Sequence, residues 1–210
     1  LTGGAINLDS ISINVSCTSG TDDKSYAVYC NNKDDAGTGN INITNCTFNS
    51  DSTANAYGVY YEANAHGNAL ITKTDIFVYN TKSDWGRCAC VDQSNAVSRI
   101  FIGTATDTED DYCHMINTFG NTPCNPFNSN NPKNPFTVYS GYYNFDVSQL
   151  VATDYICRAN QDANKDIYAY KVEKEESTNE LFLLLGNTNM FFAGTASMAL
   201  IKSSVDGFIV

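Results

Sequence analysis

The sequence predicts an all-β protein in which a parallel β-solenoid is followed by a small antiparallel β module. Short segments of alternating apolar and polar residues recur about every 30 residues in the first half of the chain. Clusters of Asn, Asp, Gly and Ser separate these segments, and no ten-residue stretch there carries a helical stripe of apolar residues. An antiparallel β-sandwich or jelly roll is the alternative, because its strands also recur at short intervals.

Each repeat contains two or three candidate strands. They are residues 11–17 and 25–30 in the first repeat, 41–48 and 56–61 in the second, 69–71, 75–79 and 85–90 in the third, and 99–102 and 112–116 in the fourth. In the segment 11–17, an apolar residue or a cysteine occupies every second position, so one face of that strand is apolar and the other is polar. Strands this short need neighbours on which to stack, and a solenoid supplies them in the adjacent coils.

Three regions are expected along the chain. Residues 1–116 form solenoid coils of about 30 residues, residues 117–136 form an Asn/Pro-rich connecting segment, and residues 137–210 form an antiparallel β module for capping or assembly. All four prolines lie in the connecting segment, and proline cannot donate a hydrogen bond to a sheet ladder. A cap is expected because a bare terminal coil is an open sheet edge. Its candidate strands are 137–145, 149–158, 166–174, 180–185, 190–201 and 207–210.

Two short words resemble the coils of a known class of protein. They are Gly-Gly-Ala-Ile at residues 3–6 and Asn-Ile-Thr-Asn-Cys-Thr-Phe-Asn at residues 42–49. Both are similar to coil words of right-handed β-helix surface proteins of the polymorphic outer-membrane and cell-surface repeat type. The similarity spans residues 3 to about 103. It implies a right-handed β-helix displayed on a surface.

The eight cysteines, in a chain rich in Asn, Ser and Thr, favour an extracellular disulfide protein. Cys17 and Cys46 are 29 positions apart, about one coil. Stacking would place their Cα atoms within the disulfide range of roughly 4.4–6.8 Å. Cys124, in the connecting segment, has Cys157 as its expected partner. Buried free thiols are the alternative, because cysteine packs well in a β core.

The net charge and the N-glycosylation sequons bear on the expected partners and location of the chain. The formal net charge of −11 disfavours a nucleic-acid partner, because an acidic chain repels phosphate. No apolar run is long enough to be a membrane span. Sequons at Asn14, Asn42 and Asn45 are usable for N-glycosylation in a secretory pathway. With the cysteines, these features predict an extracellular or cell-surface location.

No catalytic residues are predicted. Pairs of adjacent carboxylates begin at Asp22, Asp34 and Asp110, and a suitably spaced pair of carboxylates can hydrolyse glycosidic bonds. All three pairs lie in turn-like segments, where solvated charge is the common explanation.

Calcium is the one cofactor that the residues suggest. Asp162, Asn164, Asp166 and Glu173 occupy positions 1, 3, 5 and 12 of a segment with the ligand spacing of an EF-hand loop. Ile167 replaces the glycine that such a loop has at position 6.

These features favour a non-enzymatic extracellular structural or adhesive surface protein. It would assemble with itself into a fibre or surface layer, or bind glycans or surface proteins. The alternative is a polysaccharide-active β-helix enzyme or a tail-type glycan-binding protein. A glycan-binding module would use exposed tyrosines or Trp85 to stack on sugar rings.

Overall fold

The computed structural model describes most of the first 175 residues and four short strands beyond them. The described residues are 6–18, 24–30, 40–62, 67–81, 87–93, 99–129 and 135–175, with the backbone of 181–185, 188–192, 201–202 and 208–209. They fall into two compact units, Leu1–Lys174 and Glu175–Val210.

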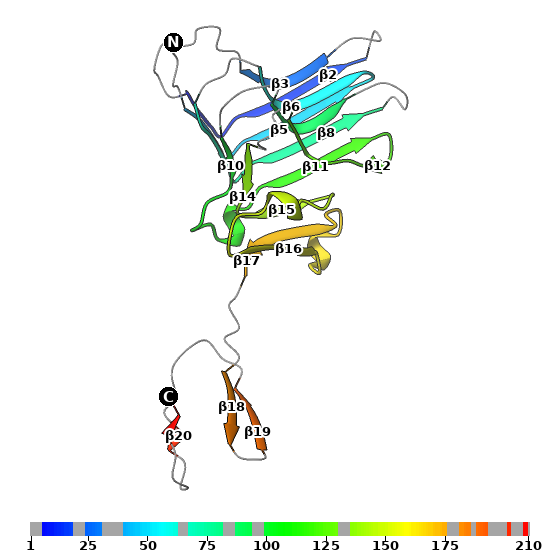
Figure 1. Cartoon of the computed structure of the whole chain (residues 1–210). Coiled ribbons are helices and arrows are strands. Elements are labelled where there is room, and N and C mark those ends of the chain that lie inside the picture. Colours follow the sequence, from blue (N-terminus) through cyan, green and yellow to red (C-terminus); the bar gives the residue numbers. More distant parts are fainter. Residues whose placement is uncertain are drawn as a thin grey trace. The chain divides into compact units, whose positions relative to one another are not determined.

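The first unit is a parallel β-solenoid, as predicted. Its strands stack in three sheets, and within each sheet strands from successive coils lie side by side (Figure 1). The first sheet contains β1 (Ile6–Asp9), β4 (Ile41–Thr44), β7 (Ala69–Thr72), β10 (Ile100–Ile102) and β14 (Phe136–Val138). The second contains β2 (Ser12–Cys17), β5 (Thr47–Ser52), β8 (Asp75–Asn80), β11 (His114–Phe119) and β15 (Gly141–Tyr143). The third contains β3 (Lys24–Cys30), β6 (Asn55–Tyr61), β9 (Cys88–Gln93) and β13 (Phe127–Ser129).

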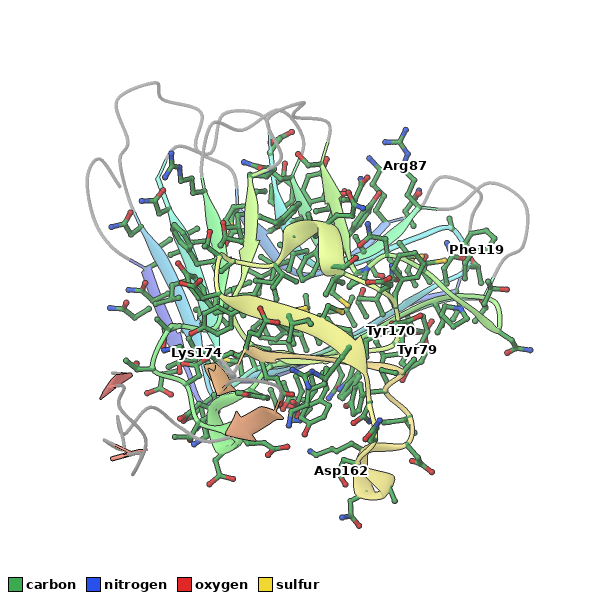
Figure 2. All side chains as sticks on the ribbon, turned by 60° about the horizontal axis from the view of Figure 1, so that its bottom comes forward. Tyr79, Arg87, Phe119, Asp162, Tyr170 and Lys174 are labelled. Carbon is green, nitrogen blue, oxygen red and sulfur yellow. The ribbon has the colours of Figure 1, made fainter. Side chains whose placement is uncertain are left out.

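The core lies between the sheets and follows from the two-residue alternation of the strands. Ile43, Phe48 and Val59, one from each sheet of the same coil, are fully buried. Their equivalents in the next coil, Ile71, Ile76 and Val91, are buried too and belong to the same apolar cluster. Side chains fill the space between the sheets (Figure 2).

The outward positions carry neutral polar ladders. Asn42 donates to Asn7 at 2.8 Å, and Asn49 donates to Asn14 at 2.6 Å, each pair coming from adjacent coils. Thr72 donates to the hydroxyl of Thr44 at 3.0 Å. Because stacked positions bring identical residues together, neutral side chains avoid the repulsion that columns of like charge would cause.

The corner between the first two sheets uses a left-handed residue in three successive coils. Ser10, Asn45 and Lys73 have φ values of 57°, 53° and 47°. The Asn45 side chain donates to the Ser10 hydroxyl at 2.8 Å, so the corner residues also stack. A single left-handed residue turns the chain sharply between two strands, and asparagine tolerates that conformation best of the three.

The predicted antiparallel module follows the solenoid. β17 (Tyr170–Lys174) pairs antiparallel with both β15 and β16 (Tyr155–Ala159), so it extends the second sheet beyond the last coil. Three 3₁₀ turns lie in the first unit: η1 (Glu109–Asp111), η2 (Ser148–Leu150) and η3 (Ala163–Lys165). None of the described helices is long and apolar enough to cross a membrane.

The structure divides the chain at a different place from the expected segment 117–136. β11 continues to Phe119 and pairs with the short β12 (Thr122–Pro123), while β13 and β14 are rungs of the solenoid. The prolines are compatible with solenoid strands here, because two of them contribute only their carbonyl oxygens to the hydrogen bonds between coils. The carbonyls of Pro126 and Pro135 accept hydrogen bonds from Val91 and Ile100 of the preceding coil, at 3.0 and 2.9 Å.

The second unit, residues 175–210, contains two antiparallel strand pairs. β18 (Leu181–Leu185) pairs with β19 (Thr188–Phe192), and β20 (Ile201–Lys202) pairs with β21 (Phe208–Ile209).

Candidate functional site

A cluster of four tyrosines on the third sheet is the strongest candidate site. We call Tyr26 and Tyr29 of β3, Tyr57 and Tyr60 of β6, and Asp92 of β9 the tyrosine face. Register stacks them in two columns, one with Tyr26 opposite Tyr57 and one with Tyr29 opposite Tyr60 opposite Asp92.

The four rings contact one another closely. Tyr26 and Tyr57 stack with centroids 5.3 Å apart and planes 12° apart, and Tyr29 and Tyr60 stack at 5.8 Å and 5°. Between the columns, the Tyr60 ring meets both Tyr26 and Tyr57 edge-on at 5.0 Å. Such aromatic pairs each contribute about 0.5–1.5 kcal/mol beyond the area they bury.

A local bend explains how residues three positions apart share one face. In a regular strand they would point to opposite faces. The ladder between β3 and β6 pairs residues 26 with 57 and 28 with 59, but not the intervening Ala27 with Gly58. Gly58 is required at this bend, because a Cβ there would lie 2.6 Å from the carbonyl oxygen of Cys90 and 2.3 Å from Ile76 Cγ2.

Hydrogen bonds and charge complete the tyrosine face. The Tyr29 hydroxyl donates to Glu62 Oε2 at 2.5 Å, and Asn128 Nδ2 donates to Asp92 Oδ2 at 2.6 Å. Burial raises the pKa of Asp92, although the hydrogen bond from Asn128 and the nearby positive charge of Arg87 partly oppose it. Burial, with the neighbouring tyrosines, also raises the pKa of Tyr26 to about 12, so its hydroxyl stays protonated at physiological pH.

The tyrosine face combines exposed and buried rings. Tyr29 is 48% exposed, whereas Tyr57 is only 4% exposed and supports the others from beneath. The exposed ring of Tyr29, with its hydroxyl and the Glu62 carboxylate beside it, suits a ligand with an apolar face and polar edges.

A second polar cluster lies where the cap meets the solenoid. His114 Nδ1 is 2.7 Å from Asp75 Oδ1, and its Nε2 is 3.0 Å from Lys165 Nζ. The imidazole stacks on Tyr142 at 5.4 Å, and the Tyr142 hydroxyl donates to Glu109.

This second cluster fastens the cap to the solenoid. Lys171 contacts Glu109 at 3.3 Å and Glu173 at 3.0 Å, and Glu173 also contacts Arg158 at 3.2 Å. The cluster joins η1, β8, β11 and β15 to η3 and the two cap strands, which is a structural role. Sequence reasoning missed it because 39 and 51 residues separate His114 from Asp75 and from Lys165.

The expected calcium ligands are not gathered into a site. Asp162 accepts from the backbone N–H of Asn164 at 2.9 Å, which begins η3, and Figure 2 shows Asp162 projecting at the periphery of the unit. Glu173 lies on β17 and pairs with Lys171 and Arg158, as described above. No group of three or more His, Cys, Asp or Glu residues in the described part of the chain is placed to hold a metal ion.

The predicted pairing of Cys17 with Cys46 is wrong. The ladder between β2 and β5 places Cys17 opposite Ser52, because the local coil is longer than the assumed 29 residues. Cys46 is buried before β5, and its thiol donates to the Thr44 carbonyl at 3.1 Å.

The predicted pairing of Cys124 with Cys157 is not formed either. Cys157 lies on β16, where its thiol shares a hydrogen bond with Asp146, whereas Cys124 lies in the fourth coil just before β13. All eight cysteines are free thiols in the structure.

The three sequon asparagines take part in the outer ladders. The side-chain amides of Asn42 and Asn45 donate to Asn7 and Ser10, and Asn14 accepts from Asn49. Asn14 and Asn45 are exposed and Asn42 is half-buried. Glycosylation at these positions stays a prediction.

The remaining candidate residues from the sequence, the carboxylate pairs and Trp85, lie either in a turn or outside the described residues. Asp110 lies on η1, and its neighbour Asp111 accepts from the Thr108 hydroxyl at 2.7 Å and caps that turn. Asp22, Asp34 and Trp85 lie outside the described residues.

Comparison of the chain with protein-family models, with curated proteins and with solved structures finds no match. The geometry therefore carries the functional argument.

Proposed function

We propose that this chain is a non-enzymatic adhesive protein of an extracellular surface, and that its tyrosine face binds glycans. The observation that carries the proposal is the pair of stacked tyrosine columns, with the half-exposed Tyr29 beside the Glu62 carboxylate. Sugars present apolar C–H faces that stack on aromatic rings and hydroxyl edges that hydrogen-bond to carboxyl and amide groups. The rigid ladder holds the rings in place before binding, which lowers the entropic cost of association.

A glycan array probed with the whole chain tests this proposal. We expect saturable binding to a subset of neutral or basic oligosaccharides, because the chain carries a net charge of −11. Replacing one contacting ring, Tyr29→Ala or Tyr60→Ala, should weaken binding about 3–10-fold, which corresponds to the free energy of one aromatic contact.

Two variants serve as controls in the glycan experiment. Tyr29→Phe keeps the ring and loses only the hydroxyl, so it should retain most of the affinity. Tyr79→Ala removes a tyrosine of similar exposure (41%) from β8, outside the tyrosine face, and should leave binding unchanged. Equal loss in Tyr79→Ala and Tyr29→Ala, or no binding to any glycan, would count against the proposal. Release of reducing ends from a bound polysaccharide would favour an enzyme instead.

The proposal also includes self-association into a fibre or surface layer. In the second sheet the strand order ends at β16, which pairs with β17 alone among the described strands, so one side of its backbone is left for another strand. Sedimentation velocity of the whole chain should then show species that grow with concentration. A monomer at all concentrations would contradict this part of the proposal and leave glycan binding to be judged separately.

A further inference from the structure

Two cysteines of adjacent coils, Cys88 at the start of β9 and Cys124 just before β13, lie beside each other. In the ladder between β9 and β13, Val91 lies opposite Phe127, and Val91 N–H donates to the Pro126 carbonyl at 3.0 Å. Cys88 lies three residues before Val91, at the start of β9, and Cys124 lies three residues before Phe127, ahead of the first residue of β13. Neighbouring strands of a sheet are about 4.8 Å apart, which falls within the range of Cα separations that disulfides span.

Asn117 holds this pair from the interior. Its buried side-chain amide donates to the Cys88 carbonyl at 3.1 Å and to the Asn125 carbonyl at 2.7 Å. Its backbone carbonyl accepts from the Cys124 N–H at 2.9 Å. One residue therefore hydrogen-bonds to the backbone of Cys88, Cys124 and Asn125 and holds the two cysteines near each other.

The two thiols also contact each other. Burial raises the pKa of Cys88 to about 12, and the adjacent Cys124 thiol, which shares a hydrogen bond with it, adds to the effect. Both side chains are only half-buried, so a small reagent can approach. The Cys124 thiol also contacts the Thr122 carbonyl at 3.6 Å. Three other thiols contact backbone carbonyls, and in the described part of the chain no second thiol is shown beside Cys46 or Cys113: Cys46 contacts Thr44, Cys90 contacts Ile76 and Ile116, and Cys113 contacts Ile71.

We propose that Cys88 and Cys124 are a disulfide-forming pair that joins the third and fourth coils covalently. The oxidant is a low-molecular-weight disulfide such as oxidised glutathione. One cysteine thiolate attacks a sulfur of the oxidant, forms a mixed disulfide and releases one small thiolate. The second cysteine thiolate then attacks the protein sulfur of the mixed disulfide and releases the other. The two cysteines lose two protons and two electrons, and the oxidant becomes two thiols.

The bond would be a covalent cross-link between the third and fourth coils. It closes a loop of roughly 37 residues, and a cross-link of this length restricts the unfolded chain strongly. It also ties the segment between β12 and β13 to β9; β13 is the last strand of the third sheet. This inference is independent of the proposed glycan binding.

The test uses the whole chain, purified under reducing conditions and then equilibrated with oxidised glutathione at pH 8.5. Free thiols are blocked and counted in denaturant, and the linkage is identified by tandem mass spectrometry. We expect the count to fall from eight to six, with a peptide joining Cys88 to Cys124. The melting temperature should rise by about 5–15 °C and return to its original value when a reductant is added.

Matched variants separate this pairing from other oxidation. Cys88→Ser and Cys124→Ser, each checked by circular dichroism when reduced, should show no oxidant-dependent rise in melting temperature. Cys17→Ser removes another half-buried thiol and should keep the full rise. The proposal is overturned if all eight thiols survive oxidation, if Cys88 is found linked to a different cysteine, or if Cys88→Ser retains the rise.

Discussion

Asp92 shows how one residue can serve a binding surface at a cost to folding. The residue is 4% exposed, lies opposite Tyr60 in the ladder, and accepts a hydrogen bond of 2.6 Å from Asn128. Burial disfavours the charged form, so the pKa of Asp92 is higher in the folded chain than in the unfolded chain.

The sign of this shift predicts a pH-dependent stability effect. A carboxyl group whose pKa is raised on folding favours the folded state only below its unfolded pKa of about 4, and this contribution is lost as the pH rises through the folded value. Asp92→Asn should therefore raise the melting temperature at pH 7, and the difference from the unmodified chain should vanish near pH 3.5. Differential scanning fluorimetry across this range measures it.

The control for this prediction is Asp9→Asn, which removes one negative charge from an exposed position. If Asp9→Asn stabilises the chain equally at pH 7, the effect comes from net charge and not from burial. A lower melting temperature for Asp92→Asn at pH 7 would contradict the prediction outright.

At the residue scale, some features of the tyrosine face and of the corner between sheets can be predicted from the sequence and others cannot. The repeated Tyr-x-x-Tyr at 26–29 and 57–60 is visible in the sequence, and so is the abundance of tyrosine. The bend that places both tyrosines of each strand on one face is not visible, because it depends on the close approach of Gly58 to another coil. The left-handed corner is readable at Asn45 but not at Lys73, where lysine has no preference for that conformation.

At the scale of elements, β15 is shorter than the strand on which it stacks, and a side chain completes it. β11 runs to Phe119, but β15 ends at Tyr143, opposite Met115. The Asn144 side chain then takes the place of the missing strand. Its Oδ1 accepts from the Asn117 N–H at 3.1 Å, and its Nδ2 donates to the Asn117 carbonyl at 2.8 Å.

Removing this amide should therefore be costly. Asn144→Leu leaves the buried N–H of Asn117 without a partner, whereas the Asn117 carbonyl keeps the hydrogen bond from the Cys124 N–H; one such unpaired group costs about 1–3 kcal/mol. We expect the free energy of unfolding, measured in urea, to fall by about 1–3 kcal/mol. Asn144→Gln keeps both an acceptor and a donor on a longer side chain, so it should lose less than Asn144→Leu. A change below about 0.5 kcal/mol in Asn144→Leu would show that water replaces the amide.

Most elements of the solenoid were predictable and their pairing was only partly so. The alternation of apolar residues placed β6, β7 and β8 within about one residue of their observed bounds, because these strands bury one face. The predicted segment 41–48 is instead divided between β4 and β5 at the corner residue Asn45, and β5 continues to Ser52. The assumed constant coil length failed. Stacked neighbours are 35, 28 and 39 residues apart at successive levels of the second sheet, so a fixed spacing aligned Cys17 with the wrong residue.

At the scale of the whole molecule, the described core belongs to the first unit. Its buried apolar cluster extends from Ile43 to Val172, and contact density divides the chain after Lys174. The antiparallel strands β16 and β17 cover the last parallel strand and contribute Val172 to that cluster.

Two truncations test this organisation. A chain that ends at Lys174 should keep the β-sheet circular dichroism of the solenoid and unfold cooperatively. A chain that ends at Asn144 lacks β16 and β17, which leaves β15 as an open edge and uncovers the core around Val138, so it should aggregate. Size-exclusion chromatography and thermal melts distinguish the two. Loss of folding in the longer truncation would show that residues 175–210 are needed for the first unit to fold.

Because the spacing between stacked strands is unequal, the chain can gain or lose residues between strands without losing the solenoid. Register stays continuous from coil to coil while the difference in residue number between stacked residues varies from 28 to 39, so the surplus is accommodated in the connections between sheets. Insertions and deletions at these connections leave the cross-section of the stack intact. The frame can thus be inherited or engineered unchanged while its connecting loops diverge in length and chemistry, and short foreign peptides can be grafted there.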